Sequence, residues 1–123
     1  MELPITGQRI STTVRDHLVE LVTTAGFVVQ IEGTMQIESE RGDRRTVSLA
    51  AGDATRAGLE SALRGSVTAA TVGPSGVLTV DLDSALRLVV PPDDKYEAWS
   101  LTGPNGYRVV CVPGGETTVW TAG

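Results

Sequence analysis

The sequence predicts a mainly β fold, an antiparallel barrel or sandwich of about ten strands built from two similar halves with one short helix between them. The first observation is that apolar residues alternate with a period near two along most of the chain, which is typical of strands. The second is that Gly, Pro, Asp and Ser interrupt this alternation at short intervals, which marks turns. The third is that helical spacing occurs only near residues 53–64.

The composition is that of a globular protein. The chain has 123 residues, of which 41% are hydrophobic and 20% charged, so we expect residues 1–123 to form a single domain with its own core. Aromatic residues are only 4%, and the core must therefore be built from Val, Leu, Ile and Ala.

Two hairpins are predicted from a repeated pattern. Residues 19–31 align without a gap on residues 78–90, and their apolar positions coincide. The first hairpin turns at residues 24–26 and the second at residues 83–85. The alternative is chance, because any two amphipathic hairpins share this alternation.

The strands around the hairpins extend the repeat. A lead-in strand begins near Gly7 in the first half and near Gly65 in the second, and a further strand pair follows each hairpin. We therefore predict that residues 7–49 and 65–112 are an internal repeat related by a pseudo-twofold axis.

A short amphipathic helix is predicted between the halves, at residues 53–64. Leu59 and Leu63 lie one helical turn apart, Asp53 is suited to the N-cap and Gly65 to the C-cap.

The stretch from residue 96 to residue 115 combines aromatics, the single cysteine and a turn. Strand alternation assigns Glu97, Trp99 and Leu101 to one face, with Trp99 in the core. Residues 103–106 have the composition of a hairpin turn, and a last short strand carries Trp120.

Charge and cysteine content limit the class of partner and the compartment. The formal net charge of −5 opposes binding to nucleic acid, and the basic residues at 41–45 are interpreted as a solvated turn because acids lie beside them. One cysteine excludes an internal disulfide, and we see no signal peptide and no apolar stretch of membrane-spanning length. We therefore expect a cytoplasmic protein that binds no membrane.

No catalytic set emerges from the sequence. Cys111 lies in an apolar run and His17 is isolated, so neither predicts a nucleophile. The spacing of a calcium loop and the signature of a phosphate-binding loop are both missing. We predict no catalytic residue, no metal and no cofactor. An enzymatic function is kept as the less favoured hypothesis.

Acidic residues near strand ends of the second half have mostly neutral counterparts in the first half. Together with nearby tyrosines they are the predicted binding residues: Asp81, Asp83, Asp93, Asp94, Tyr96, Glu97 and Tyr107. The competing interpretation is that they are solvated turn residues.

The pattern Pro-Pro-x-x-x-Tyr-Glu-Ala-Trp-x-Leu-x-Gly-Pro-x-Gly, followed by a Val-rich strand, Pro-Gly-Gly and a terminal Trp, resembles a family of small actinobacterial proteins known only as a domain of unknown function. The likeness runs from Gly7 to Trp120 and departs from the family pattern at residues 83–85. It implies a shared fold and no established reaction, cofactor or site residue.

The sequence thus favours a non-enzymatic protein-interaction module with an acidic surface, binding another protein or a second copy of itself. One alternative is a small-molecule-binding domain or enzyme with its pocket at a barrel mouth. Another is an immunity-type inhibitor that covers a basic partner.

Overall fold

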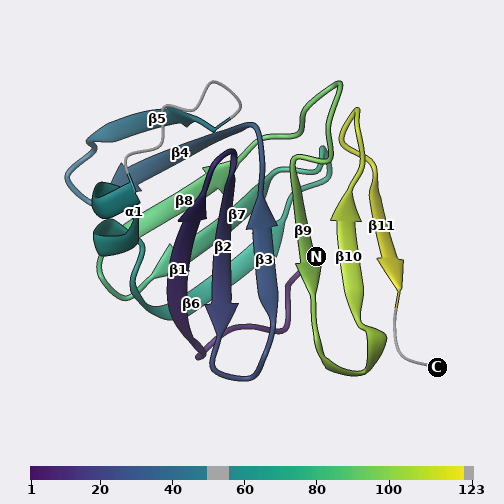
Figure 1. The fold of residues 1–123 in the computed structure, drawn as a ribbon, viewed down its shortest axis with the longest axis horizontal. Coiled ribbons are helices and arrows are strands. Elements are labelled where there is room, and N and C mark those ends of the chain that lie inside the picture. Colours follow the sequence, from purple (N-terminus) through teal and green to yellow (C-terminus); the bar gives the residue numbers. More distant parts are fainter. Residues whose placement is uncertain (50–55, 121–123) are drawn as a thin grey trace.

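The computed structural model describes residues 1–49 and 56–120, which form eleven strands, one α-helix and one 3-10 turn (Figure 1). In chain order these are β1 (Arg9–Arg15), β2 (Leu18–Thr23), β3 (Val28–Ile31), β4 (Thr34–Ser39), β5 (Arg44–Ser48), α1 (Arg56–Ala62), β6 (Gly65–Val72), β7 (Leu78–Leu82), β8 (Leu86–Val90), β9 (Trp99–Thr102), η1 (Pro104–Gly106), β10 (Arg108–Cys111) and β11 (Thr117–Trp120). The strands form one antiparallel sheet in the order β11-β10-β9-β3-β2-β1-β6-β7-β8-β4-β5. The predicted fold class, mainly β with one short helix, is confirmed.

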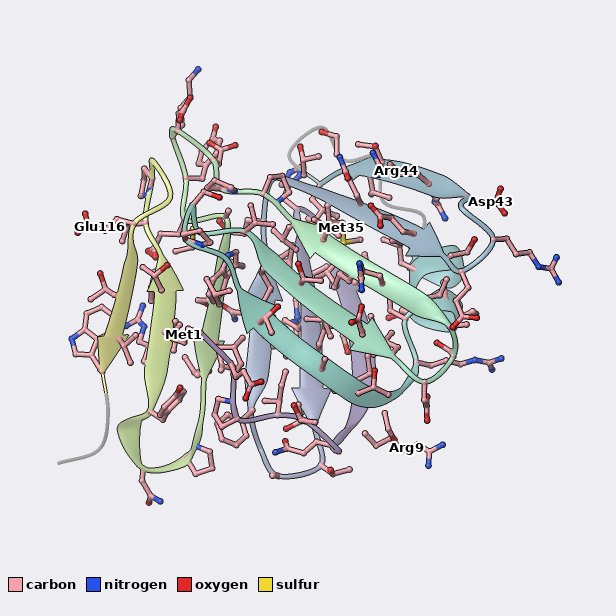
Figure 2. All side chains as sticks on the ribbon, turned by 180° about the vertical axis from the view of Figure 1, so that it is seen from behind. Met1, Arg9, Met35, Asp43, Arg44 and Glu116 are labelled. Carbon is pink, nitrogen blue, oxygen red and sulfur yellow. The ribbon has the colours of Figure 1, made fainter. Side chains whose placement is uncertain are left out.

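The sheet bends sharply where β1 meets β6. These strands pair over only two residue pairs, Arg9 with Ser66 and Ile10 with Gly65. Beyond this corner β6, β7, β8 and β4 lie behind β1, β2 and β3, and Figure 2 shows them as the nearer layer when the molecule is seen from behind. The outermost strands of the order, β11 and β5, each pair on one side only in the described residues, so the sheet is not closed.

The core lies between these layers. The buried residues are mostly Val, Leu and Ile, with Met35, Ala70, Ala98, Trp99 and Cys111, so the core is largely aliphatic as the low aromatic content predicted. No helix in the described ranges is both long enough and apolar enough to cross a membrane.

The N-terminal segment covers the part of β6 that β1 leaves unpaired. Leu3 N donates to Ala70 O at 2.9 Å, and Gly7 N donates to Val67 O at 2.7 Å. Leu3 and Ile5 are buried. The segment therefore satisfies the backbone of β6 and adds apolar side chains to the core.

Helix α1 packs beside β1 and ends at Ala62, two residues before the predicted end at Arg64. Leu59 and Leu63 are buried, as their spacing predicted, and Val14 N on β1 donates to Glu60 Oε2 at 3.2 Å. The predicted N-cap, Asp53, lies outside the described residues. Gly65, the predicted C-cap, is the first residue of β6 and has a φ of +106°.

The two predicted hairpins exist and share one register. Aligned residues occupy matching places in the ladders: Val19 pairs with Ile31 and Leu21 with Val29 in β2–β3, and Leu78 pairs with Val90 and Val80 with Leu88 in β7–β8. Their turns also match, with left-handed φ values of +89° at Gly26 and +69° at Ala85. The shared register supports the internal repeat, which stays a prediction for residues 7–49 and 65–112 as a whole.

The strands that follow each hairpin pair with the opposite half. After β3 the chain passes to β4, which pairs with β8, with Ile37 opposite Leu88. After β8 it passes to β9, which pairs with β3, with Leu101 opposite Val29. Each half therefore completes the sheet of the other.

The predicted strand from residue 96 begins only at Trp99, so Glu97 is wrongly assigned to the core face. Glu97 is exposed, while Ala98 and Trp99 are consecutive and both buried. The physical reason is a turn held by Asp93, whose Oδ1 accepts hydrogen bonds from Lys95 N at 2.7 Å and Tyr96 N at 3.1 Å. Trp99 and Leu101 are buried as predicted.

Candidate functional site

The predicted acidic residues lie at opposite ends of β8. Asp81 and Asp83 are near its start, since Asp81 pairs with Arg87, whereas Asp93, Asp94 and Glu97 follow its end. Strand β8 has 5 residues, and at about 3.3 Å per residue it separates the two groups by roughly 17 Å. The structure does not bring the two groups together.

The first group is engaged within the sheet. Asp81 Oδ1 accepts from Arg87 Nε at 2.7 Å and Asp81 Oδ2 from Arg87 Nη2 at 3.3 Å, in a bidentate cross-strand pair. This hydrogen bond and the Asp81 charge raise the pKa of Arg87, and Glu38 adds to the effect. Asp83 Oδ1 accepts from Ser66 N at 3.0 Å. Asp81 thus links β7 to β8 and Asp83 links the β7–β8 turn to β6, and a hollow of about 380 Å³ lies beside Asp81.

The second group is presented on a fixed turn. Besides the two bonds made by its carboxylate, Asp93 accepts a hydrogen bond at its backbone O from Gly114 N at 2.9 Å. This ties the β8–β9 connection to the turn between β10 and β11. Asp94, Tyr96 and Glu97 are exposed, and Tyr96 keeps 51% of its surface accessible.

A hollow of about 320 Å³ lies beside Tyr96. Its lining also includes His17 from the β1–β2 turn, Leu18 from the start of β2, and Glu32 and Gly33 from the β3–β4 connection. The Nδ1 of His17 lies 3.2 Å from the backbone O of Leu49, and because a carbonyl oxygen only accepts, Nδ1 is the donor of this hydrogen bond. A smaller hollow of about 140 Å³ is lined by Glu32, Glu97 and Arg108, among others.

We call this region the β8–β9 surface and define it by Glu32, Asp93, Asp94, Tyr96 and Glu97. Glu32 is not among the predicted binding residues, which were drawn from the acidic strand ends of the second half. The same signal was available, since Glu32 follows the buried Ile31 at a strand end. His17, isolated in the sequence, lies at the hollow because the β1–β2 turn reaches it.

Tyr107 lies away from this surface. It follows η1 in the β9–β10 connection, at the other end of β9 from Glu97. Its ring packs edge-on against Phe27, with the centroids 5.9 Å apart, and both side chains pack against the core. Tyr107 therefore packs against the core through Phe27, a contact that its prediction as a binding residue did not include.

Within residues 1–49 and 56–120, no group of three or more His, Cys, Asp and Glu side chains is placed to hold a metal ion.

We expect Cys111 to be unreactive toward thiol reagents in the native protein. Its side chain is fully buried, and its Sγ lies 3.5 Å from Gly76 O, to which it donates. Burial raises the pKa of the thiol, so the nucleophilic thiolate is disfavoured as well as inaccessible. Labelling with a maleimide, followed by mass spectrometry, should require denaturant. Rapid labelling of the native protein would contradict the burial of Cys111.

A family profile decides the classification, because the family described as "Family of unknown function (DUF6188)" matches residues 1–121. The chain belongs to the DUF6188 family. This agrees with the resemblance to a domain of unknown function that the C-terminal pattern indicated. Neither the curated proteins nor the solved structures contain a match to this DUF6188 chain.

Proposed function

We propose that the protein is a non-enzymatic binding module whose β8–β9 surface contacts a basic protein partner. The observation that carries the proposal is the arrangement around Tyr96. An exposed tyrosine stands beside a hollow of about 320 Å³, on a turn that hydrogen bonds hold in place, with carboxylates around it.

Tyr96 supplies the apolar part of the contact. Tyrosines are enriched among residues that dominate protein interfaces, because the ring buries a large area and the hydroxyl can bond at the rim. The turn made by Asp93 fixes the backbone at Tyr96, so less backbone entropy is lost when a partner binds than for a free loop.

The carboxylates supply the charge. Glu32, Asp94 and Glu97 are exposed around Tyr96, with Lys95 as the opposite charge in the same loop and Arg108 beside Glu97. The local balance is negative, in line with the formal net charge of −5. Such a surface mainly speeds the encounter with a positively charged partner and selects against acidic ones.

The test is capture of partners from the native lysate with the wild type and with the triple variant Asp94→Asn/Tyr96→Ala/Glu97→Gln. Asp93 is kept, because its carboxylate holds the turn. The matched control is Glu40→Gln/Asp43→Asn, which neutralises two exposed acids at the far end of β4, where Figure 2 shows Asp43.

We expect the triple variant to lose the partner and the control to retain it. For the captured protein, association with the wild type should slow roughly tenfold or more as the Debye length falls from ~10 Å to ~3 Å between 0.1 and 1 M salt. The proposal fails if the triple variant binds as well as the wild type, or if association is independent of salt.

One observation favours the small-molecule alternative. The hollow brings His17, Glu32 and Tyr96 to one place from three separate connections of the chain, and convergent polar groups around a pocket are typical of ligand sites. If nothing is captured, this hollow is the place to test with small ligands. Capture of a basic toxin would support the immunity-type alternative, which is a narrower form of the proposed function.

A further inference from the structure

We propose that two copies of the chain associate edge to edge through β11, as an antiparallel pair related by a twofold axis. The inference goes beyond the proposed function and uses a different part of the molecule. It rests on the free edge of β11, on the direction of its backbone groups and on the charges at its ends.

Strand β11 ends the strand order and pairs only with β10 among the described strands. Its sequence, Thr117 to Trp120, has no charged residue and no proline. The strand at the other end of the order, β5, carries Arg44 and Arg45, both exposed. Charged side chains on an edge strand discourage pairing with another chain, so β5 is protected in a way that β11 is not.

The backbone pattern shows which groups of β11 face outward. Val112 N donates to Glu116 O at 2.9 Å, so the polar groups of Glu116 point toward β10. Because the direction alternates along a strand, those of Thr118 and Trp120 also point toward β10. The N–H and C=O groups of Thr117 and Val119 then point to the free edge.

These groups are self-complementary. A twofold axis through Thr118 places Thr117 of one copy opposite Val119 of the second copy. The same axis places Val119 of the first copy opposite Thr117 of the second. Each pair exchanges two hydrogen bonds in an antiparallel ladder. In this register opposite residues are an even number of positions apart, so their side chains lie on the same face, as a continuous sheet requires.

Charge supports the same register. This register puts Glu116 of one copy opposite Trp120 of the second copy. Within that second copy, Arg108 is stacked on Trp120, 5.4 Å from the ring centroid. Figure 2 shows Glu116 at the outer edge of the molecule, beside β11. Each end of the pair thus has the Glu116 carboxylate of one copy beside the Trp120 ring and the stacked Arg108 of the other, and this proximity of opposite charges favours the pairing.

Apolar surface at the edge would be covered by the second copy. Val119 and Trp120 are 43% and 48% exposed. Under β11 lies a hollow of about 460 Å³ whose lining includes Met1, Val72 and Val119. Pairing places Thr117 and Val119 of the second copy on the same face as this hollow and shields its outer rim.

The experiment measures the mass of the full chain in solution by light scattering and sedimentation over a range of concentrations. We expect a reversible dimer. Val119→Pro removes an N–H that points to the free edge and leaves the β10–β11 ladder intact, so it should raise the dissociation constant about thirtyfold, as expected for two lost intermolecular hydrogen bonds. Glu116→Lys should also weaken the dimer, and Glu116→Lys/Arg108→Glu should restore it.

The matched control is Glu40→Lys, the same charge reversal at an exposed residue remote from β11, which should leave the dimer unchanged. A wild type that is monomeric at every concentration overturns the proposal. So does a dimer that tolerates both Val119→Pro and Glu116→Lys. Glu116 is exposed and precedes the strand, so this variant keeps the test decisive even if the proline variant fails to fold.

Discussion

Trp99→Ala is expected to lower the free energy of unfolding by about 3–5 kcal/mol, the range for removing a large buried aromatic side chain. Trp99 is 1% exposed and lies between the layers of the sheet. Its indole Nε1 donates to Gly76 O at 2.9 Å, a bond between β9 and the β6–β7 turn. The variant therefore leaves both a cavity and a buried carbonyl with one donor fewer.

The measurement is urea denaturation followed by circular dichroism at one protein concentration. Trp99→Phe should lower the free energy of unfolding by less, about 1–3 kcal/mol, because an aromatic ring still fills most of the space. The remaining loss comes from the missing hydrogen bond to Gly76. Trp120→Ala is the matched control, and since Trp120 is 48% exposed we expect a change within about 1 kcal/mol. An unchanged midpoint for Trp99→Ala would show that Trp99 is not a core residue in solution.

Gly76→Ala is expected to destabilise the protein by about 2–5 kcal/mol through strain and overlap together. Gly76 has a φ of +90°, and a Cβ built there lies 2.2 Å from Gly115 O and 2.9 Å from Gly115 C. These are backbone atoms of the β10–β11 turn, so no side chain can rotate away to make room. The shift would also move Gly76 O, which accepts from Trp99 and Cys111.

Gly106→Ala separates the two causes. Gly106 has a similar φ of +82°, but nothing lies within 4 Å of its added Cβ. Gly106→Ala should lower the free energy of unfolding by about 1–2 kcal/mol, which is the penalty for an alanine in the left-handed backbone conformation alone. Equal losses from Gly76→Ala and Gly106→Ala in urea denaturation would mean that the two turns separate easily and that their contact contributes little.

The sequence was informative about single elements for a clear physical reason. The two-residue period assigns Leu21 and Val80 to an inward face, and a turn at residues 24–26 or 83–85 brings each strand against its neighbour in the chain. Fold class, hairpins and the buried side of α1 depend on such local rules. These three features can therefore be predicted from the sequence alone.

Pairing between distant strands could not be read in this way. Alternation does not say which edge a strand will join, so nothing indicated that β4 meets β8 or that β9 meets β3. The same limit applied to the candidate site. The sequence placed Asp81 and Asp93 in one acidic group, whereas the length of β8 separates them, and it could not foresee that His17 and Glu32 lie beside Tyr96.

The exchange of strands between the halves bears on how the chain reaches its native state. During synthesis, β3 and β4 emerge before β8 and β9, so their final neighbours do not yet exist. Neither half can bury its own apolar face alone, and the late, non-local pairings carry a large loop-closure entropy. We therefore expect slow, cooperative folding in which both halves become ordered in one step, with no stable intermediate that contains only one of them.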